Sequence, residues 1–268
     1  MIILGESLMN DNSCELKYGN AKLIIKKSES FVFYATFIAN EYKNLDIRKG
    51  DIVIDLGANI GDFTVKAGKL LDNTGKIIAI EPNHENVEIL KENLELNNIK
   101  NVEILECAIT DEDGYSYLIG DDVAATVDEN NHEGSKIKTL TTDTLLDQLN
   151  HPKNIVVKMD IEGGEKYLFK NKEFIHSIRE ISMELHGKEN IEVITNILKN
   201  NNFVIKKYKT KDEVKNMLKS FLIHPIDFIK CERLTGYVAI KGAISTFKGN
   251  NPVPSVNNKE LMVIHAKK

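Results

Sequence analysis

Alternate residues between positions 55 and 61 have the types needed to hold a nucleoside cofactor. The segment reads Asp55-x-Gly57-x-Asn59-x-Gly61 and follows an apolar run. In an open α/β sheet, a glycine turn after the first strand lies where small ligands bind, and glycines let a ligand come close to the backbone. The spacing differs from the Gly-x-Gly-x-x-Gly of dinucleotide sites. The segment therefore predicts a nucleoside-binding loop of another class.

Two further strand ends supply groups that would complete this site. Glu81 ends an apolar run twenty residues beyond the loop, which is the expected distance for an acidic partner of two ribose hydroxyls. Pro82 then stops the run, and Asn83 can cap the helix that follows. Cys107 and Ala108 are small residues beside which a flat purine could fit, although Cys107 could equally be a buried structural residue.

Acidic side chains and a histidine are grouped at the ends of the next two apolar runs. Asp160 and Glu162 follow the fourth run, with Glu165 close behind, and three clustered carboxylates are hard to justify structurally. Glu184 and His186 are two residues apart in an extended segment, so they lie on the same side. This arrangement predicts a general base, His186, with an orienting carboxylate and with Asp160 or Glu162 nearby.

The same part of the chain could in principle bind a divalent cation, because carboxylates and imidazole are both metal ligands. Such a site would use Asp160, Glu162 and His186, but no spacing requires it, and no metal is predicted. The three cysteines are far apart and form no Cys-x-x-Cys pair. This argues against a disulfide framework and a structural zinc site, and it favours a reducing cytosol.

A doubly wound sheet would bring these chemical groups to one edge. From residue 51, short runs rich in Ile and Val alternate with helical patterns, which is typical of parallel strands joined by crossover helices. We expect strands at 51–56, 76–81, 102–109, 154–160, 179–185, 203–208 and 236–241. We expect helices at 60–71, 84–97, 142–149, 164–176 and 190–200. The fold class is therefore α/β, with a doubly wound seven-stranded sheet.

Three regions are expected along the chain. Residues 1–44 form a small N-terminal α+β appendage, with short antiparallel strands at 21–26 and 31–34 and a helix at 35–44. Residues 45–248 form the sheet domain. Residues 249–268 contain two prolines and are expected to be a loosely held C-terminal extension, although 261–264 could dock as an edge strand.

Charge and hydropathy exclude several classes of protein. The formal net charge of −5 gives no bulk attraction to nucleic acid or to an anionic membrane. The first residues lack the basic region of a signal peptide. No run reaches the roughly 18 apolar residues of a membrane span. We therefore expect a cytoplasmic protein; the sequence does not indicate its oligomeric state.

Five segments together resemble the FkbM family of S-adenosylmethionine-dependent methyltransferases. They are residues 53–64, 79–83, 90–94, 158–165 and 183–186. The Asp-Ile-Glu-Gly-Gly-Glu element at 160–165 is the family-specific part, whereas the glycine loop alone would indicate only the wider superfamily. The resemblance implies a class I methyltransferase fold, which is Rossmann-like and mostly parallel, with an antiparallel last strand.

The resemblance also implies a reaction, which is methyl transfer from S-adenosylmethionine to a hydroxyl of a sugar or another small acceptor. His186 would take the acceptor's proton, in a catalytic set of His186, Asp160, Glu162 and Glu184. The cofactor would be held by the glycine loop and the neighbouring strand ends, namely Asp55, Gly57, Ala58, Asn59, Gly61, Phe63, Glu81, Pro82, Asn83, Cys107, Ala108 and Asp160.

Other functions stay open at this point. An RNA methyltransferase is a less favoured alternative, because Asp212 and Glu213 interrupt the basic cluster that would bind RNA, and a solvated helix face explains that cluster more simply; its members are Lys206, Lys207, Lys209, Lys211, Lys215 and Lys219. A nicotinamide-dependent oxidoreductase on a Rossmann-like fold would lack its usual glycine motif. A non-catalytic module would not need its strand-end carboxylates. The polar segment 120–134 could be a flap over the acceptor or a solvated loop.

Overall fold

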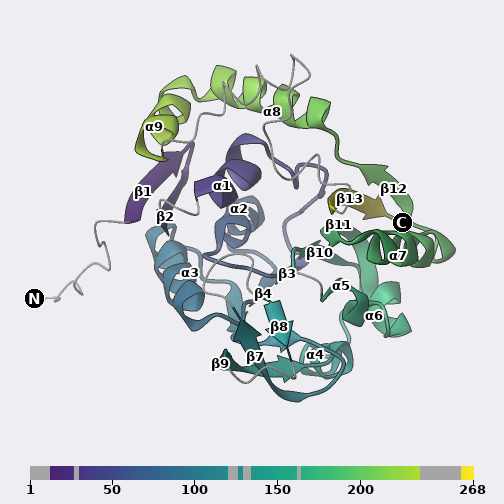
Figure 1. The fold of residues 1–268 in the computed structure, drawn as a ribbon. Helices are drawn as coiled ribbons and strands as arrows, with labels where there is room; N and C mark the ends of the chain where they lie inside the picture. The colour runs from purple at the N-terminus through teal and green to yellow at the C-terminus, as the bar shows by residue number, and fades with distance from the viewer. Residues whose placement is uncertain (1–12, 27–29, 120–125, 129–133, 162–163, 236–260) are drawn as a thin grey trace, which may run out of the picture.

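The computed structural model describes residues 13–26, 30–119, 126–128, 134–161, 164–235 and 261–268. Its centre is a seven-stranded sheet with the order β12-β13-β11-β10-β3-β4-β5 (Figure 1). Neighbouring strands are parallel, except that β13 is antiparallel to both β11 and β12. The predicted fold class is confirmed. The strands are β3 (Ile52–Leu56), β4 (Lys76–Ile80), β5 (Val102–Leu105), β10 (Ile155–Met159), β11 (Ile178–His186), β12 (Val204–Lys207) and β13 (Leu261–Lys267).

Alternate residues of the central strands pack into cores on opposite faces of the sheet. Ile54 and Ile78 belong to the core that includes residues of α4 (Thr142–Gln148), α6 (Lys172–Ser177) and α7 (Lys188–Asn200). Val53 and Ile77 pack instead with residues of α2 (Asp62–Leu71), and Ala79 with residues of α3 (His84–Leu96). Both faces are therefore covered, which explains why these runs are almost continuously apolar.

The end of the chain supplies an interior strand of the sheet. β13 lies between β11 and β12, and Ile264 and Ala266 are fully buried in the main core. A period-two pattern places Met262 on the same face, which favours a strand over a loose tail. The expected extension is therefore wrong for residues 261–268, and the strand is internal and not at an edge. The strand expected at 236–241 lies outside the described residues.

The N-terminal hairpin is attached to α3 by two asparagines. The hairpin consists of β1 (Ser13–Tyr18) and β2 (Ala21–Lys26). Asn93 Oδ1 accepts a hydrogen bond from the Ile24 amide at 2.7 Å, and its Nδ2 donates to the Ile24 carbonyl at 3.0 Å. Asn97 makes the same pair of bonds to Lys22, at 3.0 and 2.5 Å. The predicted strand at 21–26 is confirmed, but its partner is β1.

Residues 30–38 are helical, so the strand expected at 31–34 is wrong. They form α1 (Ser30–Phe33) and the π-helix η2 (Tyr34–Ile38), where the helix expected at 35–44 is reduced to its first turn. Phe33 and Phe37 stack with ring centroids 5.0 Å apart, a contact that helical spacing permits and strand spacing does not. Above them run α8 (Thr210–Ile223) and α9 (Pro225–Thr235) (Figure 1). Ser220 Oγ donates to the Ile38 carbonyl at 2.8 Å, which ties α8 to η2.

Two other expected elements are divided in the structure. The strand expected at 102–109 ends at Leu105, and residues 108–109 form β6 in a separate four-stranded sheet. That sheet has the order β6-β9-β7-β8, with β7 at Gly114–Ile119, β8 at Thr126–Asp128 and β9 at Ser135–Leu140. The helix expected at 164–176 is divided into α5 (Glu165–Leu168) and α6. Most of the segment considered as a flap lies outside the described residues, among which no helix is long and apolar enough to cross a bilayer.

Candidate functional site

The strand order reverses between β3 and β10, and the candidate site lies at the carboxyl ends of these two strands. The Asp160 amide donates to the Leu56 carbonyl at 3.0 Å, which holds the two strand ends together. Gly57 has φ +73°, and a Cβ at this position would lie 1.9 Å from the Asp160 carbonyl oxygen. Only glycine therefore fits here, for its backbone conformation and for its lack of a side chain.

Asp55 supports the loop from inside the protein, and its side chain is completely buried. Thr64 Oγ1 donates to Asp55 Oδ2 at 2.6 Å, and Lys158 Nζ lies 3.3 Å from Oδ1. Lys158 also donates to the Gly57 carbonyl at 2.6 Å. Burial raises the pKa of Asp55, and Lys158 opposes that effect. Lys158 was not predicted, although a lysine inside an apolar strand is a signal that it has a buried partner.

Glu81 connects the glycine loop to the start of α3. Its Oε2 accepts from the Asn59 amide at 2.8 Å, and its Oε1 accepts from the Asn83 amide at 3.0 Å. Asn86 Nδ2 donates to the same Oε1 at 3.3 Å. Burial raises the pKa of Glu81, while these donors oppose the rise. Glu81 thus fixes the Asn59 backbone, which has φ +49°, and both residues stay next to the strand ends.

The expected cofactor residues differ in exposure. Phe63 packs in the core, with its ring centroid 5.2 Å from that of Tyr42, and its contact with the cofactor stays a prediction. Ala58 and Cys107 are buried in hydrophobic cores, which favours the structural interpretation of Cys107, and burial raises its pKa to about 11. Gly61 and Ala108 are also buried, whereas partial exposure is shared by Gly57, Asn59, Pro82, Asn83 and Asp160.

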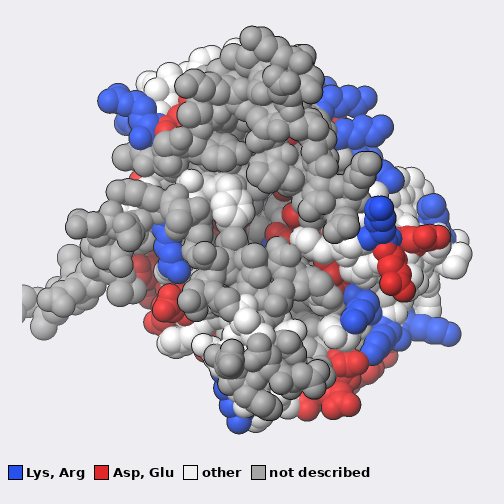
Figure 2. Space-filling model, in the orientation of Figure 1, with Lys and Arg blue, Asp and Glu red and all other residues white. Residues whose placement is uncertain are grey.

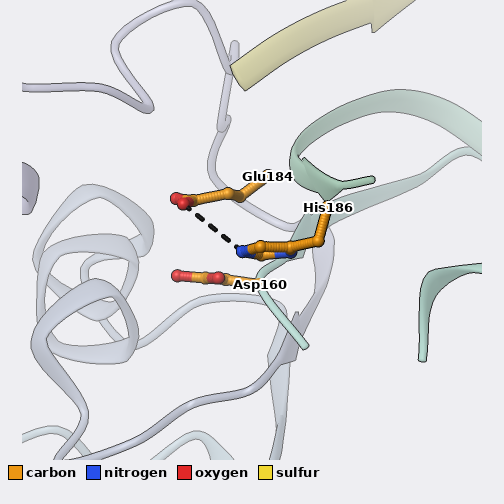
Figure 3. Close-up of side chains that lie close together, drawn as sticks. All are labelled: Asp160, Glu184 and His186. Carbon is orange, nitrogen blue, oxygen red and sulfur yellow. Dashed lines mark ion pairs between the residues drawn. The ribbon is translucent and has the colours of Figure 1, made fainter. Parts of the chain in front are cut away.

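Asp160, Glu184 and His186 come together at the ends of β10 and β11. One ligand atom from each residue lies within 4.8 Å of the others. His186 Nε2 lies 3.7 Å from Glu184 Oε1, and the Asp160 carboxylate lies on the other side of the imidazole ring (Figure 3). All three residues are partly exposed. The structure thus brings together three of the four residues predicted to be catalytic; Glu162 lies outside the described residues.

The carboxylate that orients His186 is Glu165, and not Glu184 as the sequence suggested. Glu165 is fully buried at the start of α5, and its Oε1 lies 2.7 Å from His186 Nδ1. The His186 amide also donates to this oxygen at 3.3 Å, and Asn190 Nδ2 donates to Oε2 at 2.8 Å. Glu165 belongs to the predicted carboxylate cluster, but its role depends on how the turn before α5 bends.

The N-terminal region adds buried charges beside the cluster, which sequence reasoning missed. Burial, helped by the nearby charges of Glu213 and Asp160, raises the pKa of Glu41 to about 8. Asp62 accepts a hydrogen bond from Thr36, and burial raises its pKa to about 6. A few acidic atoms are visible between the grey atoms in the middle of the face in Figure 2. Acidic groups therefore lie at this end of the sheet together with the cations Lys158 and Lys66.

The lysines considered for RNA binding lie on β12, on the segment after it and on α8. They are exposed, and Asp212 at the start of α8 accepts from the Lys209 amide at 3.2 Å. Lys43 from the N-terminal region approaches the same Asp212, at 4.0 Å. Asp212 therefore stabilises the start of α8. The solvated helix face stays a prediction for Lys211, Lys215 and Lys219, whereas Lys206 and Lys207 lie on β12.

Comparison with known proteins gives one family and several relatives. The model of the methyltransferase FkbM domain matches residues 55–205, which is more than half of the chain. A probable cobalt-precorrin-6B C(15)-methyltransferase of Sulfurisphaera tokodaii is 42% identical over 53 residues, 20% of this chain and 28% of the relative. The corresponding protein of Sulfolobus acidocaldarius is 36% identical over 53 residues, with the same coverage. The chain thus spans less than a third of these relatives.

Solved structures with a similar arrangement have low sequence identity to this chain. A methyltransferase FkbM from Methylobacillus flagellatus is 18% identical, with a TM-score of 0.49, over 66% of this chain and 44% of the other. TYW2 from M. jannaschii, solved in complex with AdoMet, is 13% identical, with a TM-score of 0.47, over 97% of this chain and 87% of the other.

Proposed function

We propose that this chain, which belongs to the FkbM methyltransferase family, methylates a hydroxyl group of a sugar or another small molecule. Membership of the family rests on the match over residues 55–205 and confirms the predicted class of enzyme, an S-adenosylmethionine-dependent methyltransferase. It also removes the nicotinamide-dependent oxidoreductase from consideration. The hydroxyl acceptor and the roles of individual residues are the proposal.

The cofactor would lie across the carboxyl ends of β3 and β4. Gly57 and Asn59 give a ligand access to the backbone, and Glu81 offers carboxylate oxygens to the ribose hydroxyls. Pro82 and Asn83 border the same space and are partly exposed. Asp55 would act indirectly, because its buried carboxylate supports the loop through Lys158 and Thr64.

The acceptor would be activated at the cluster of Asp160, Glu184 and His186. Methyl transfer from a sulfonium is an in-line displacement, so the nucleophilic oxygen must be held about 3–3.5 Å from the methyl carbon. A hydroxyl must also lose its proton, and a group that accepts it lowers the barrier. The cluster lies beside the loop at the switch point and would serve this purpose.

The single observation that carries the proposal is the support given to His186 by Glu165. A buried carboxylate that holds Nδ1 fixes the tautomer and the direction of the ring. Nε2 then faces the partly exposed space shared with Asp160 and Glu184. Such an arrangement suits proton removal from a bound hydroxyl, and a merely structural histidine would not need it.

The test is an assay with S-adenosylmethionine that carries a radiolabelled methyl group. We would offer the enzyme a panel of glycosides and phenols, and bulk tRNA in a parallel reaction. We expect label in a hydroxyl acceptor, with an oxygen-linked methyl identified by mass spectrometry and by resistance of the product to amine-specific reagents. Label in tRNA alone, with binding that weakens steeply as salt rises, would instead support the RNA methyltransferase.

A further inference from the structure

The groups at the ends of β10 and β11 have the composition and spacing of a metal site. Asp160, Glu184 and His186 each present one ligand atom, and these atoms lie within 4.8 Å of one another (Figure 3). Ligands about 2.1 Å from an octahedral ion are separated by about 3–4.2 Å. Ligand atoms up to 4.8 Å apart would therefore need to approach one another by about 0.6–1.8 Å, which rotation of the side chains can supply. Three protein ligands would leave positions for water or for acceptor oxygens.

A second observation lies behind the imidazole ring. Glu165 accepts from Asn190 on one oxygen and from the His186 amide on the other. With both oxygens already accepting, the 2.7 Å contact with His186 Nδ1 favours the tautomer that carries a proton on Nδ1. In neutral His186 the lone pair is therefore on Nε2, the nitrogen that faces Glu184. Metal-binding histidines are usually held in this way, by a carboxylate on the other ring nitrogen.

Buried groups of both signs surround this part of the molecule. Tyr42 lies close by, and after burial the causes that raise its pKa are Asp160, Glu41, Glu184 and Asp62. Lys158 bonds the Gly57 carbonyl, lies 5.7 Å from the centre of the Tyr42 ring, and interacts electrostatically with Asp55 and Asp160.

We infer that Asp160, Glu184 and His186 bind a divalent cation of the Mg²⁺/Mn²⁺ class. Two carboxylates favour Mg²⁺ and Mn²⁺, and the added imidazole favours Mn²⁺ over Mg²⁺. Glu165 is a positioning residue for this site. Glu165 itself is not a ligand of the ion, because it contacts the imidazole ring of His186.

The inference rests on the proposed function for the hydroxyl acceptor, and it replaces His186 as the base by the ion together with Glu184. A hydroxyl bound to the cation loses its proton more readily. The O–H bond breaks and the proton passes to the Glu184 carboxylate. The oxygen then bonds to the methyl carbon, while the bond from that carbon to sulfur breaks and the sulfonium becomes a neutral thioether. His186 is then a ligand that holds the ion beside the acceptor.

Titration with Mn²⁺, followed by electron paramagnetic resonance of the free ion, tests the site directly. We expect the wild-type chain to bind one Mn²⁺. Glu184→Gln and Asp160→Asn should each weaken binding by at least about 10-fold, and Glu165→Gln by about 10-fold through the orientation of His186. The matched control is His151→Ala, because His151 also lies between two carboxylates, with Asp147 and Glu173 each 3.1 Å from a ring nitrogen. That variant should bind Mn²⁺ as the wild type does.

Each outcome separates the cation from the proposed function. Wild-type affinity in Glu184→Gln, or equal weakening in His151→Ala, would overturn the cation site. A wild-type chain that binds no Mn²⁺ but methylates a hydroxyl in the presence of a chelator would overturn the site and keep the proposed function. Tight Mn²⁺ binding without hydroxyl methylation would keep the site and reject the acceptor. A cooperative urea unfolding transition, followed by circular dichroism, shows that each variant is folded.

Discussion

The glycine loop and the acceptor cluster lie at the same edge of one sheet, yet they differ in how their polar groups are satisfied. In the loop, Glu81 accepts three hydrogen bonds from groups of the protein. Asp55 is fully buried and forms an ion pair with Lys158. In the cluster, partly exposed Asp160, Glu184 and His186 face one another. The polar groups of the loop are hydrogen-bonded within the protein, whereas the cluster brings together charged groups that a bound ligand could neutralise. Binding and chemistry are therefore expected to be separable by mutation.

The largest separation should come from His186→Ala. We expect turnover to fall by about 10²–10⁴-fold, because either proton removal or the position of a cation is lost. Affinity for S-adenosylhomocysteine should stay unchanged, since the loop does not depend on His186. Steady-state kinetics and calorimetry on the same preparation measure both quantities. An equal loss of cofactor affinity would show that loop and cluster are a single unit, and His151→Ala serves as the control.

The loop should be broken by Gly57→Ala. Gly57 has φ +73°, and the added Cβ would lie 1.9 Å from the Asp160 carbonyl oxygen. The ends of β3 and β10 would therefore have to move apart. We expect a loss of about 2–4 kcal/mol in the free energy of unfolding, measured with urea, together with loss of cofactor binding. Gly50→Ala is the matched control, because Gly50 has φ +87° but open space around it. Equal losses in both variants would assign the effect to backbone conformation alone.

The parts of the fold that the sequence predicted are those with local signals. The central strands β3, β4 and β10 were recognisable because both faces of each are buried, and the helices because of their apolar stripes. The place of β13 could not be read in this way, since its pairing with β11 joins segments about 80 residues apart in the sequence. The strand expected at 31–34 was wrong because four apolar residues in a row are compatible with the period of a helix and with that of a strand.

The candidate site shows the same limit at the level of side chains. The strand-end position of Asp160 and His186 followed from sheet topology, so their meeting was predictable. Glu165 could not be placed, because its direction depends on the turn that starts α5. The side chain of Phe63 could not be placed either, because a motif match gives a residue's position but not the face of α2 on which it lies, and in the structure that face packs in the core.

A smaller effect is expected from Glu81→Gln. The change replaces one acceptor oxygen by a donor that would face the Asn59 or the Asn83 amide. We expect about a 10-fold loss of affinity for S-adenosylhomocysteine, because the hydrogen bond to a charged group is lost and the loop is disturbed. Glu106→Gln is the control, since Glu106 is exposed and forms an ion pair with exposed His84. Unchanged affinity in Glu81→Gln would contradict the ribose-binding role.

The smallest effect concerns the acidic surroundings of the cluster, and it depends on pH. Burial raises the pKa of Glu41 from 4.5 to about 8, so the folded chain binds a proton that the unfolded chain releases between these values. The stabilisation from this group is complete below pH 4.5 and is lost as the pH rises through about 8. Glu41→Gln should therefore flatten the fall in unfolding free energy between pH 5 and 8, by about 1 kcal/mol per pH unit. Urea unfolding across this range, with exposed Glu15→Gln as control, measures the slope. An unchanged slope would mean that Glu41 keeps its charge beside Asp160, and the contrast between a satisfied loop and a charge-laden cluster would then be weaker than the structure indicates.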